Sequence, residues 1–207
     1  MAPSPLATTA AVALGVFLLV RAGALVIALL QPLLARSRPK RADRPGVSVL
    51  VPVKVVDDAF EAALRSLLDQ DYPLLEIVIC GDAQSAAAFA AARAIVGEAP
   101  AVPVVFATAT EIVGPNPKIT NLAAAVKVAR HELLLIKDSN AVLERGGLAD
   151  LVGELHGRVG MVCAIPIATE PEGIAAETER AMMNGQLAPL VLAGSSLTID
   201  IGYGKVM

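Results

Sequence analysis

The stretch NPKITNLAAAVKVARHELLLIKDSNAVL, residues 116–143, carries the clearest signals of the fold. It opens with Asn116 and Pro117, which are typical of the cap and the first position of a helix. We predict that this helix runs to about Arg130, and that the apolar run at 132–137 forms a buried strand. The strand ends abruptly in a short polar cluster, Lys137-Asp138-Ser139-Asn140.

The rest of the chain repeats this alternation of helices and strands. Short apolar runs bounded by turn residues predict further strands at 47–53, 74–80, 102–108 and 159–165. Apolar residues at helical spacing predict a helix over 57–70, and an alanine-rich run predicts another over 83–99. Strands that alternate with helices of this length indicate an α/β domain with a mostly parallel sheet.

Polar side chains follow several of the predicted strands at the point where each strand ends. Lys54 follows the first strand, and Asp82 and Asp138 follow the second and the fourth. In an open parallel sheet, ligands bind beyond the carboxyl ends of the strands. Lys118 lies at the start of a helix, where the helix dipole already favours anions. Carboxylates and a lysine in these places predict a diphosphate bound through a divalent metal.

The first 46 residues differ from the rest. We expect an N-terminal tail over residues 1–8 and a transmembrane anchor over residues 9–35, because a bilayer is crossed by roughly 20 apolar residues. The only charge in the anchor is Arg21, which we expect either to face other helices or to extend to the membrane surface. Residues 36–46 form a linker with five basic residues and one acidic residue, which predicts that the chain beyond it is cytosolic.

Several classes of function are excluded by composition and motif. The net charge is −3, which predicts no nucleic-acid partner. The two cysteines, Cys80 and Cys163, lie in apolar runs without zinc-ligand spacing, so we interpret both as buried hydrophobic residues. The chain has no Walker A motif, and no Gly-x-Gly-x-x-Gly follows the first strand, which disfavours a dinucleotide site. Each of the two histidines is interpreted as structural or solvated.

Four blocks in this order resemble a known family: PGVSVLVPVKVVDD, DQDYPLLEIVICGDAQ, NPKITNLAAAVKVARHELLLIKDSN and VGMVCAIPIATEPEGIAAETE. The chain resembles the ceramide glucosyltransferases, which are membrane glycosyltransferases of family 21 with a GT-A catalytic domain. The bacterial transferase that adds N-acetylglucosamine to hopanoid lipids is also similar. The resemblance implies a partial GT-A domain over residues 47–207.

The resemblance also implies roles for individual residues. Asp82 is expected to contact the nucleotide, and Asp138 is expected to bind the metal, Mg or Mn, that bridges the diphosphate of a UDP-sugar. Asn140 stands where a stricter Asp-x-Asp motif has its second carboxylate, and it is expected to be a weak or water-mediated ligand. The remaining residues expected at the donor site are Pro52, Lys54, Asn116, Lys118 and Asn121.

The implied reaction is the transfer of glucose from a UDP-sugar to ceramide at the cytosolic face of a membrane. A UDP-N-acetylglucosamine-dependent hopanoid transferase and a catalytically incomplete nucleotide-sugar-binding fragment are the alternatives. The family has a third aspartate, the expected catalytic base, and then an Arg-Trp motif. The chain contains no tryptophan, so we expect the base, that motif and further membrane spans to lie beyond Met207.

Simpler interpretations of the same residues remain open. Asp82 is also typical of a surface turn, and Asp138 with Ser139 is typical of a helix cap. Lys54 and Lys118 would then be solvated lysines. A soluble α/β domain unrelated to sugar transfer would fit the same alternation of elements, but it would leave the apolar anchor unexplained.

Overall fold

The computed structural model describes residues 4–34, 41–97, 100–196 and 206. These residues belong to two compact units, one containing the described residues up to 34 together with 165–196, and the other containing 41–164 and Val206. The sequence predicted one partial domain over 47–207, whereas residues 165–196 group with the N-terminal helix. The predicted boundary at residue 47 stays a prediction.

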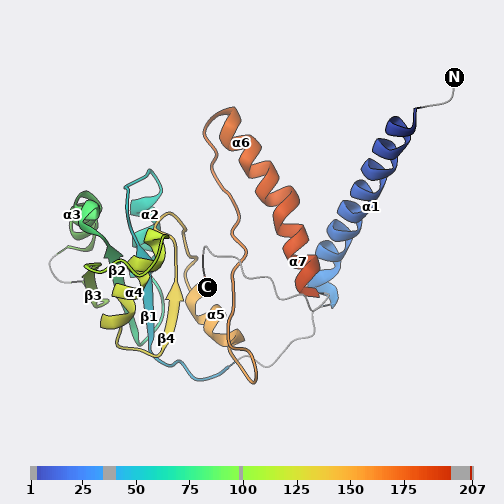
Figure 1. The fold of residues 1–207 in the computed structure, drawn as a ribbon. Helices are drawn as coiled ribbons and strands as arrows, with labels where there is room; N and C mark the ends of the chain where they lie inside the picture. Colours follow the sequence, from blue (N-terminus) through green and yellow to red (C-terminus); the bar gives the residue numbers. More distant parts are fainter. Residues whose placement is uncertain (1–3, 35–40, 98–99, 197–205, 207) are drawn as a thin grey trace. The chain divides into compact units, whose positions relative to one another are not determined.

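The larger unit is built on four parallel strands in the order β3-β2-β1-β4 (Figure 1). The strands are β1 (Val47–Pro52), β2 (Leu75–Gly81), β3 (Val104–Thr108) and β4 (Leu133–Ile136). The predicted α/β class with a mostly parallel sheet is therefore confirmed. Because all four strands point the same way, their carboxyl ends share one edge of the sheet, which we call the carboxyl edge.

Helices cover both faces of this sheet. They are α2 (Phe60–Leu68), α3 (Ala86–Val96), preceded by the short helix η1 (Ala83–Ser85), α4 (Pro117–Val128) and α5 (Gly147–Glu154). Side chains alternate between the faces along each strand, so Val49 and Ile77 join α2, α3 and α5 in the main core. Leu50 and Val78 pack with α4 in a smaller core on the other face.

Local chemistry explains where these helices begin and end. The Asn116 side chain accepts a hydrogen bond from the Lys118 backbone N–H at 3.0 Å, and Pro117 occupies the first turn of α4, as the sequence predicts. Helix α3 ends at Val96, and the next residue, Gly97, has a φ of 75° that is readily adopted only by glycine. The predicted helix over 83–99 begins as η1, and its residues 98 and 99 lie outside the described residues.

The predicted strand at 159–165 is wrong, because the structure forms no strand there. Val159 and Met161 are exposed instead of packed in a sheet. The Ala164 N–H donates to the Val206 carbonyl at 3.1 Å, but no ladder extends through the described residues of this segment. A strand requires a partner backbone as well as an apolar sequence.

A buried carboxylate ties the strands together at the opposite edge, where they begin. Glu76 is 1% exposed and accepts hydrogen bonds from the Ser48 hydroxyl and the Arg130 N–H, each at 2.5 Å. The His131 N–H donates to Ser48 Oγ at 3.1 Å. A Cβ atom on Gly46 would lie 2.2 Å from the His131 ring, so this close packing requires glycine. These contacts favour a structural role for His131.

The buried thiol of Cys80 agrees with its interpretation as a small hydrophobic residue. Cys80 lies in β2 and is 0% exposed, and burial raises the pKa of its thiol to about 12. A thiol with such a pKa is almost entirely protonated near neutral pH and is therefore a poor nucleophile and metal ligand.

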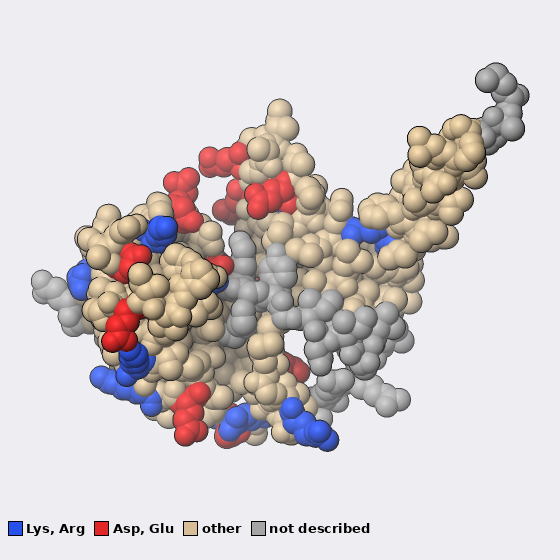
Figure 2. All heavy atoms as spheres, in the orientation of Figure 1, with Lys and Arg blue, Asp and Glu red and all other residues tan. Residues whose placement is uncertain are grey.

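The smaller unit contains α1 (Pro5–Leu34), α6 (Gly173–Met182), the π-helical segment η2 (Met183–Leu187) and α7 (Ala188–Ser196). Helix α1 is long and apolar enough to cross a membrane, and its large apolar side chains are mostly exposed. Arg21 is the only charged residue in the sequence of α1, and the visible face of this helix is almost entirely without acidic or basic side chains (Figure 2). The Arg21 guanidinium donates to the Gly185 carbonyl at 3.2 Å, as expected if this arginine faces other helices.

Candidate functional site

Two of the predicted site residues, Asp82 and Asp138, lie at the carboxyl edge of the sheet. Asp82 follows β2 directly, and Asp138 follows β4 after one intervening residue. Strands β2 and β4 lie on either side of β1. Neighbouring strands are about 4.8 Å apart, so the ends of β2 and β4 are roughly 10 Å apart across β1.

An ion pair joins the start of α4 to the end of β4, the two elements formed by the stretch 116–143. Lys118 Nζ lies 2.5 Å from Asp138 Oδ1, and the two side chains are 37% and 25% exposed. Helix α4 packs against β1, β2 and β3, which brings its first turn to the carboxyl edge. The structure therefore places together two of the residues that the sequence predicted for the donor site.

Asp82 is engaged in its own turn. Its Oδ1 accepts hydrogen bonds from the Gln84 N–H at 2.9 Å and from the Ser85 hydroxyl at 3.2 Å, and it caps η1. Ser85 Oγ also lies 2.9 Å from the Val53 carbonyl, which links the ends of β1 and β2. A Cβ atom on Gly81 would lie 2.5 Å from Ser85. These contacts agree with the interpretation of Asp82 as a turn residue. Its contact with a nucleotide stays a prediction.

The other predicted site residues differ in how far they are exposed to solvent. Lys54 and Asn140 are exposed, and Pro52 is the last residue of β1. Asn116 serves as the cap of α4, as described above. Asn121 is 4% exposed on α4, and its Oδ1 has no hydrogen-bond partner among the described residues. A buried polar atom without a partner is rare and commonly marks the place of a water, an ion or a ligand.

The side chains at this edge fit a divalent metal that takes most of its ligands from water and substrate. Asp138 supplies a carboxylate and Asn140 an amide oxygen, the hard ligands that Mg²⁺ and Mn²⁺ accept. Within the described ranges, no group of three His, Cys, Asp or Glu residues could form a cage for a metal ion. Mg²⁺ is commonly bound by one or two carboxylates together with waters and substrate phosphates, and this edge offers that kind of site.

Sequence reasoning missed Lys137, which is fully buried directly before Asp138. Its Nζ donates to the Ala63 carbonyl at 3.2 Å and to the Asp138 carbonyl at 3.3 Å. Burial lowers the pKa of the Lys137 ammonium to about 8, while the charge of Asp138 opposes this shift. Nothing in the sequence signals this burial, because a lysine at a strand end is ordinarily solvated.

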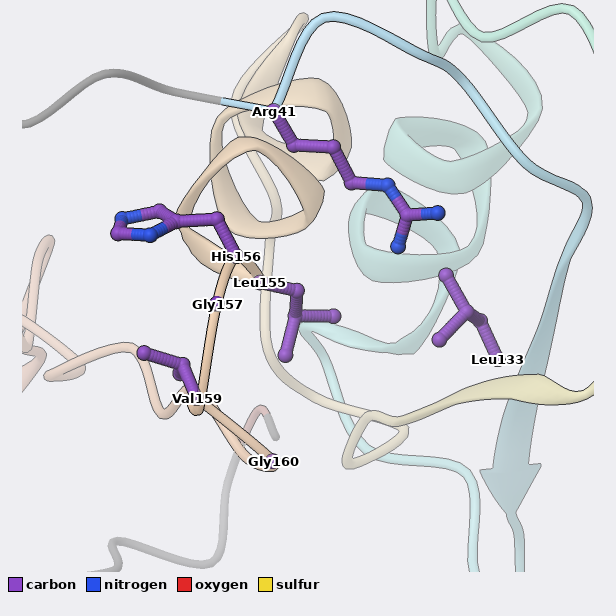
Figure 3. Close-up of a pocket in the computed structure, with 7 residues that line it drawn as sticks. All are labelled: Arg41, Leu133, Leu155, His156, Gly157, Val159 and Gly160. Atoms are coloured by element: carbon purple, nitrogen blue, oxygen red, sulfur yellow. The ribbon is translucent and has the colours of Figure 1, made fainter.

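A cavity of about 520 Å³ lies at the edge where β4 begins, away from the predicted site. Arg41 and Leu133 turn toward one another, and the His156 ring points away from them (Figure 3). The Arg41 guanidinium makes two hydrogen bonds to Asp43, at 2.6 and 2.7 Å, so its charge is compensated. We assign no chemistry to this cavity, whose lining residues are Arg41, Leu133, Leu155, His156, Gly157, Val159 and Gly160.

Comparison with known proteins places this geometry in a family. The model of glycosyl transferase family 21 matches residues 10–207. Ceramide glucosyltransferase 1 of Caenorhabditis elegans is 28% identical over 162 residues, which cover 77% of this chain and 35% of that protein. The ceramide glucosyltransferase of Komagataella phaffii is 33% identical over 115 residues, which cover 54% of this chain and 23% of that protein. The chain thus spans about a third or less of the length of these relatives.

A solved structure resembles the fold. The mannosyltransferase PcManGT from Pyrobaculum calidifontis, in complex with GDP-Man and Mn²⁺, is 26% identical and aligns with a TM-score of 0.53. The alignment covers 67% of this chain and 42% of that chain. This likeness confirms the predicted GT-A-like fold.

Proposed function

Because the chain belongs to glycosyl transferase family 21, we propose that it acts in the transfer of glucose from a UDP-sugar to the hydroxyl group of ceramide. The observation that carries the proposal is the Asp138–Lys118 pair at the carboxyl edge. It combines a carboxylate for a metal with a cation for a diphosphate. Support comes from the two ceramide glucosyltransferases and from the GDP-Man and Mn²⁺ complex of the structural relative.

The proposed donor site assigns one task to each part of the carboxyl edge. Asp82 and the end of β1, with Pro52 and Lys54, receive the nucleoside. Asp138, with Asn140, holds the metal, which when bound neutralises the charge that develops on the departing diphosphate. Lys118 approaches the same diphosphate from the first turn of α4, and Asn116 and Asn121 line that approach. The ends of β2 and β4, roughly 10 Å apart, leave room for a ligand with a nucleoside at one end and a diphosphate at the other.

The acceptor is proposed to reach the site from the membrane. Helix α1 would anchor the chain, and the basic residues after it would keep the sheet domain on the cytosolic side. A base must remove the proton from the acceptor hydroxyl as the glycosidic bond forms. We assign that role to no residue of this chain, and in the sequence-based interpretation the base is the third family aspartate.

The experiment is a calorimetric titration of the full chain in lipid nanodiscs with UDP-glucose, UDP-N-acetylglucosamine and GDP-mannose, each with Mn²⁺. The proposal predicts that UDP-glucose binds most tightly. Preference for UDP-N-acetylglucosamine would favour the hopanoid alternative, and preference for GDP-mannose would contradict the UDP assignment. The absence of binding by any of the three to the folded chain would contradict the donor site itself.

A transfer assay separates the enzyme from a binding fragment. Radiolabelled donor is incubated with nanodiscs that contain ceramide or a hopanoid, and the lipid extract is counted. Label in the ceramide fraction is the expected result for a complete enzyme. Donor binding without label in either lipid would identify the catalytically incomplete nucleotide-sugar-binding fragment.

A further inference from the structure

The first turn of α4 carries an unusual cation. Lys118 lies at the second residue of the helix, where the helix dipole makes a positive charge mildly unfavourable. Its ammonium nevertheless lies 2.5 Å from Asp138. The placement is therefore explained by the carboxylate that Lys118 contacts and not by the stability of the helix.

The backbone of this helix terminus is already engaged. The Lys118 N–H donates to Asn116 Oδ1 at 3.0 Å, and the Ile119 N–H donates to the Asn116 carbonyl at 3.1 Å. Pro117 has no N–H to donate. Anions usually bind the free N–H groups of a helix start, but here those groups are capped. Recognition of a diphosphate at this terminus consequently falls to the Lys118 side chain.

Lys118 and a divalent metal compete for the same carboxylate. Metal–oxygen distances at such sites are about 2.1 Å, so a metal on Asp138 would lie within about 5 Å of an ammonium that is itself 2.5 Å from Oδ1. Two like charges at that separation repel one another. The flexible four-carbon stem of a lysine allows its ammonium to move away from the metal.

We propose that Lys118 is an exchangeable cation that occupies Asp138 until the metal–nucleotide complex arrives and then transfers its contact to the diphosphate. The inference rests on the proposed donor site and adds to it how metal and nucleotide binding are coupled. Free metal must displace Lys118 and gains no compensating contact, so it binds weakly. The metal–nucleotide complex supplies phosphate oxygens that receive the displaced ammonium, so it binds more tightly.

The exchange predicts two effects of opposite sign for one substitution. Lys118→Met removes the competing cation, so the affinity for Mn²⁺ alone should rise by about fivefold or more. The same substitution removes a diphosphate contact, so the affinity for UDP at saturating Mn²⁺ should fall by about fivefold or more. A residue that only stabilised the helix or only bound phosphate would not produce this pair of changes.

The test uses the full chain in nanodiscs, with free Mn²⁺ followed by electron paramagnetic resonance and UDP binding followed by calorimetry. Lys127→Met is the matched control, because Lys127 lies on the same helix and pairs with the exposed Glu111 at 3.2 Å. The control should change neither affinity. Lys118→Gln is measured in parallel and should reproduce both effects, since it also removes the charge.

The outcomes distinguish this inference from the proposed function. If the parent chain binds no UDP in the presence of Mn²⁺, the proposed donor site fails. If the parent binds UDP and both Lys118 variants leave the Mn²⁺ affinity unchanged or lower it, only the exchange is overturned. Circular dichroism of each variant establishes that it is folded, and the partly exposed Lys118 side chain makes a folded variant the expected result.

Discussion

At the scale of single residues, Lys137 is the feature that most needs a physical explanation. An ammonium that is 0% exposed has lost its water shell, and it contacts two carbonyl oxygens, those of Ala63 and Asp138. Burial of a charge without a full set of partners is destabilising. The lowered pKa of Lys137 expresses the same penalty, since burial makes the charged form less favourable than it is in water.

Replacement of Lys137 by methionine should stabilise the folded chain. The pKa change from 10.5 to about 8 corresponds to a penalty of roughly 3 kcal/mol on the charged form, taken as an upper bound. The substitution leaves both carbonyls with other donors, because Ser66 Oγ contacts Ala63 O at 2.8 Å and the Ala141 N–H contacts Asp138 O at 3.2 Å. Chemical unfolding with a metal chelator present measures the gain.

The pH dependence of that gain has a definite sign. The folded pKa lies below the unfolded value, so the unfolded chain binds more protons between about pH 8 and 10.5, and parent stability contributed by this group rises across that window. The advantage of the methionine variant should therefore be full below pH 8 and decline toward pH 10.5. A variant that is less stable than the parent at pH 7 would contradict the account.

The burial of Lys137 also marks a limit of sequence reasoning at this scale. The sequence predicted Asp138 at a strand end and the cap at Asn116, because both depend on local patterns of a few residues. The Lys118–Asp138 contact joins groups 20 positions apart, and the Lys137–Ala63 contact joins groups 74 apart. Such contacts depend on how the helices pack on the sheet, and local sequence patterns do not predict that packing.

At the scale of elements, one face of α2 holds the loop that follows β4. The Ala63 carbonyl and Ser66 lie on that face, and Gln70 follows the helix two residues after its last residue, Leu68. Ser66 Oγ accepts from the Leu143 N–H at 3.1 Å. The Gln70 amide donates to the Leu143 and Glu144 carbonyls and accepts from the Leu148 N–H. These contacts fix the loop that carries Asp138.

Gln70→Leu should loosen that loop. Gln70 is 8% exposed, and its loss removes the hydrogen bonds of its amide to the buried Leu148 N–H and the Leu143 carbonyl. The Glu144 carbonyl keeps the Gly147 N–H as a donor. We expect a loss of about 2–4 kcal/mol in the free energy of unfolding, because each unsatisfied buried group costs roughly 1–3 kcal/mol. Amide hydrogen exchange should become faster at Leu143 and Leu148.

The matched control is Glu61→Ala in α2, the helix that Gln70 follows. Its ion pair with Arg65 is about 60% exposed on both sides, and substitutions at such sites change stability by about 0.5 kcal/mol or less. Equal stability losses for the Gln70 and Glu61 variants, or unchanged exchange at Leu148, would show that the Gln70 contacts do not hold the loop.

Elements were predicted well where pattern and packing agree. The strand predicted at 47–53 is β1 (Val47–Pro52), and the helix predicted from Pro117 is α4, which ends at Val128 instead of Arg130. A run of β-branched residues signals β1, and a capped helix start signals α4. The segment 159–165 has the same kind of apolar run as β1, but among the described residues it forms no ladder. Its apolar pattern alone therefore gave a wrong strand prediction.

At the scale of the whole molecule, the chain combines a GT-A-like sheet domain with one long apolar helix. Helix α1 exposes most of its large apolar side chains, including Leu14 and Leu18. Exposed apolar surface of this extent on a helix is expected to contact lipid or protein. Arg21 is the one charged side chain of α1, and its contact with the Gly185 carbonyl gives its charge a polar partner.

The anchor prediction is tested by adding charge to the apolar surface of α1. Leu14→Arg combined with Leu18→Arg should release much of the chain from membranes in alkaline carbonate extraction, because each arginine near the centre of a span costs about 2.5–3.5 kcal/mol on insertion scales. The control pair Leu14→Ile and Leu18→Ile should remain in the pellet with the parent. Full retention of the double-arginine variant would argue against α1 as the anchor.

Asp138 is proposed to hold the metal through which a nucleotide diphosphate binds, and calorimetry of UDP with the full chain in nanodiscs tests this claim. Parent, Asp138→Asn and the control Asp69→Asn are titrated with Mn²⁺ and again with a chelator. Asp69 is exposed at the end of α2, which leads away from the carboxyl edge. We predict Mn²⁺-dependent binding in the parent and the control, and at least a tenfold loss in Asp138→Asn with unchanged folding. Binding that persists in the chelator, or in Asp138→Asn, would contradict the claim.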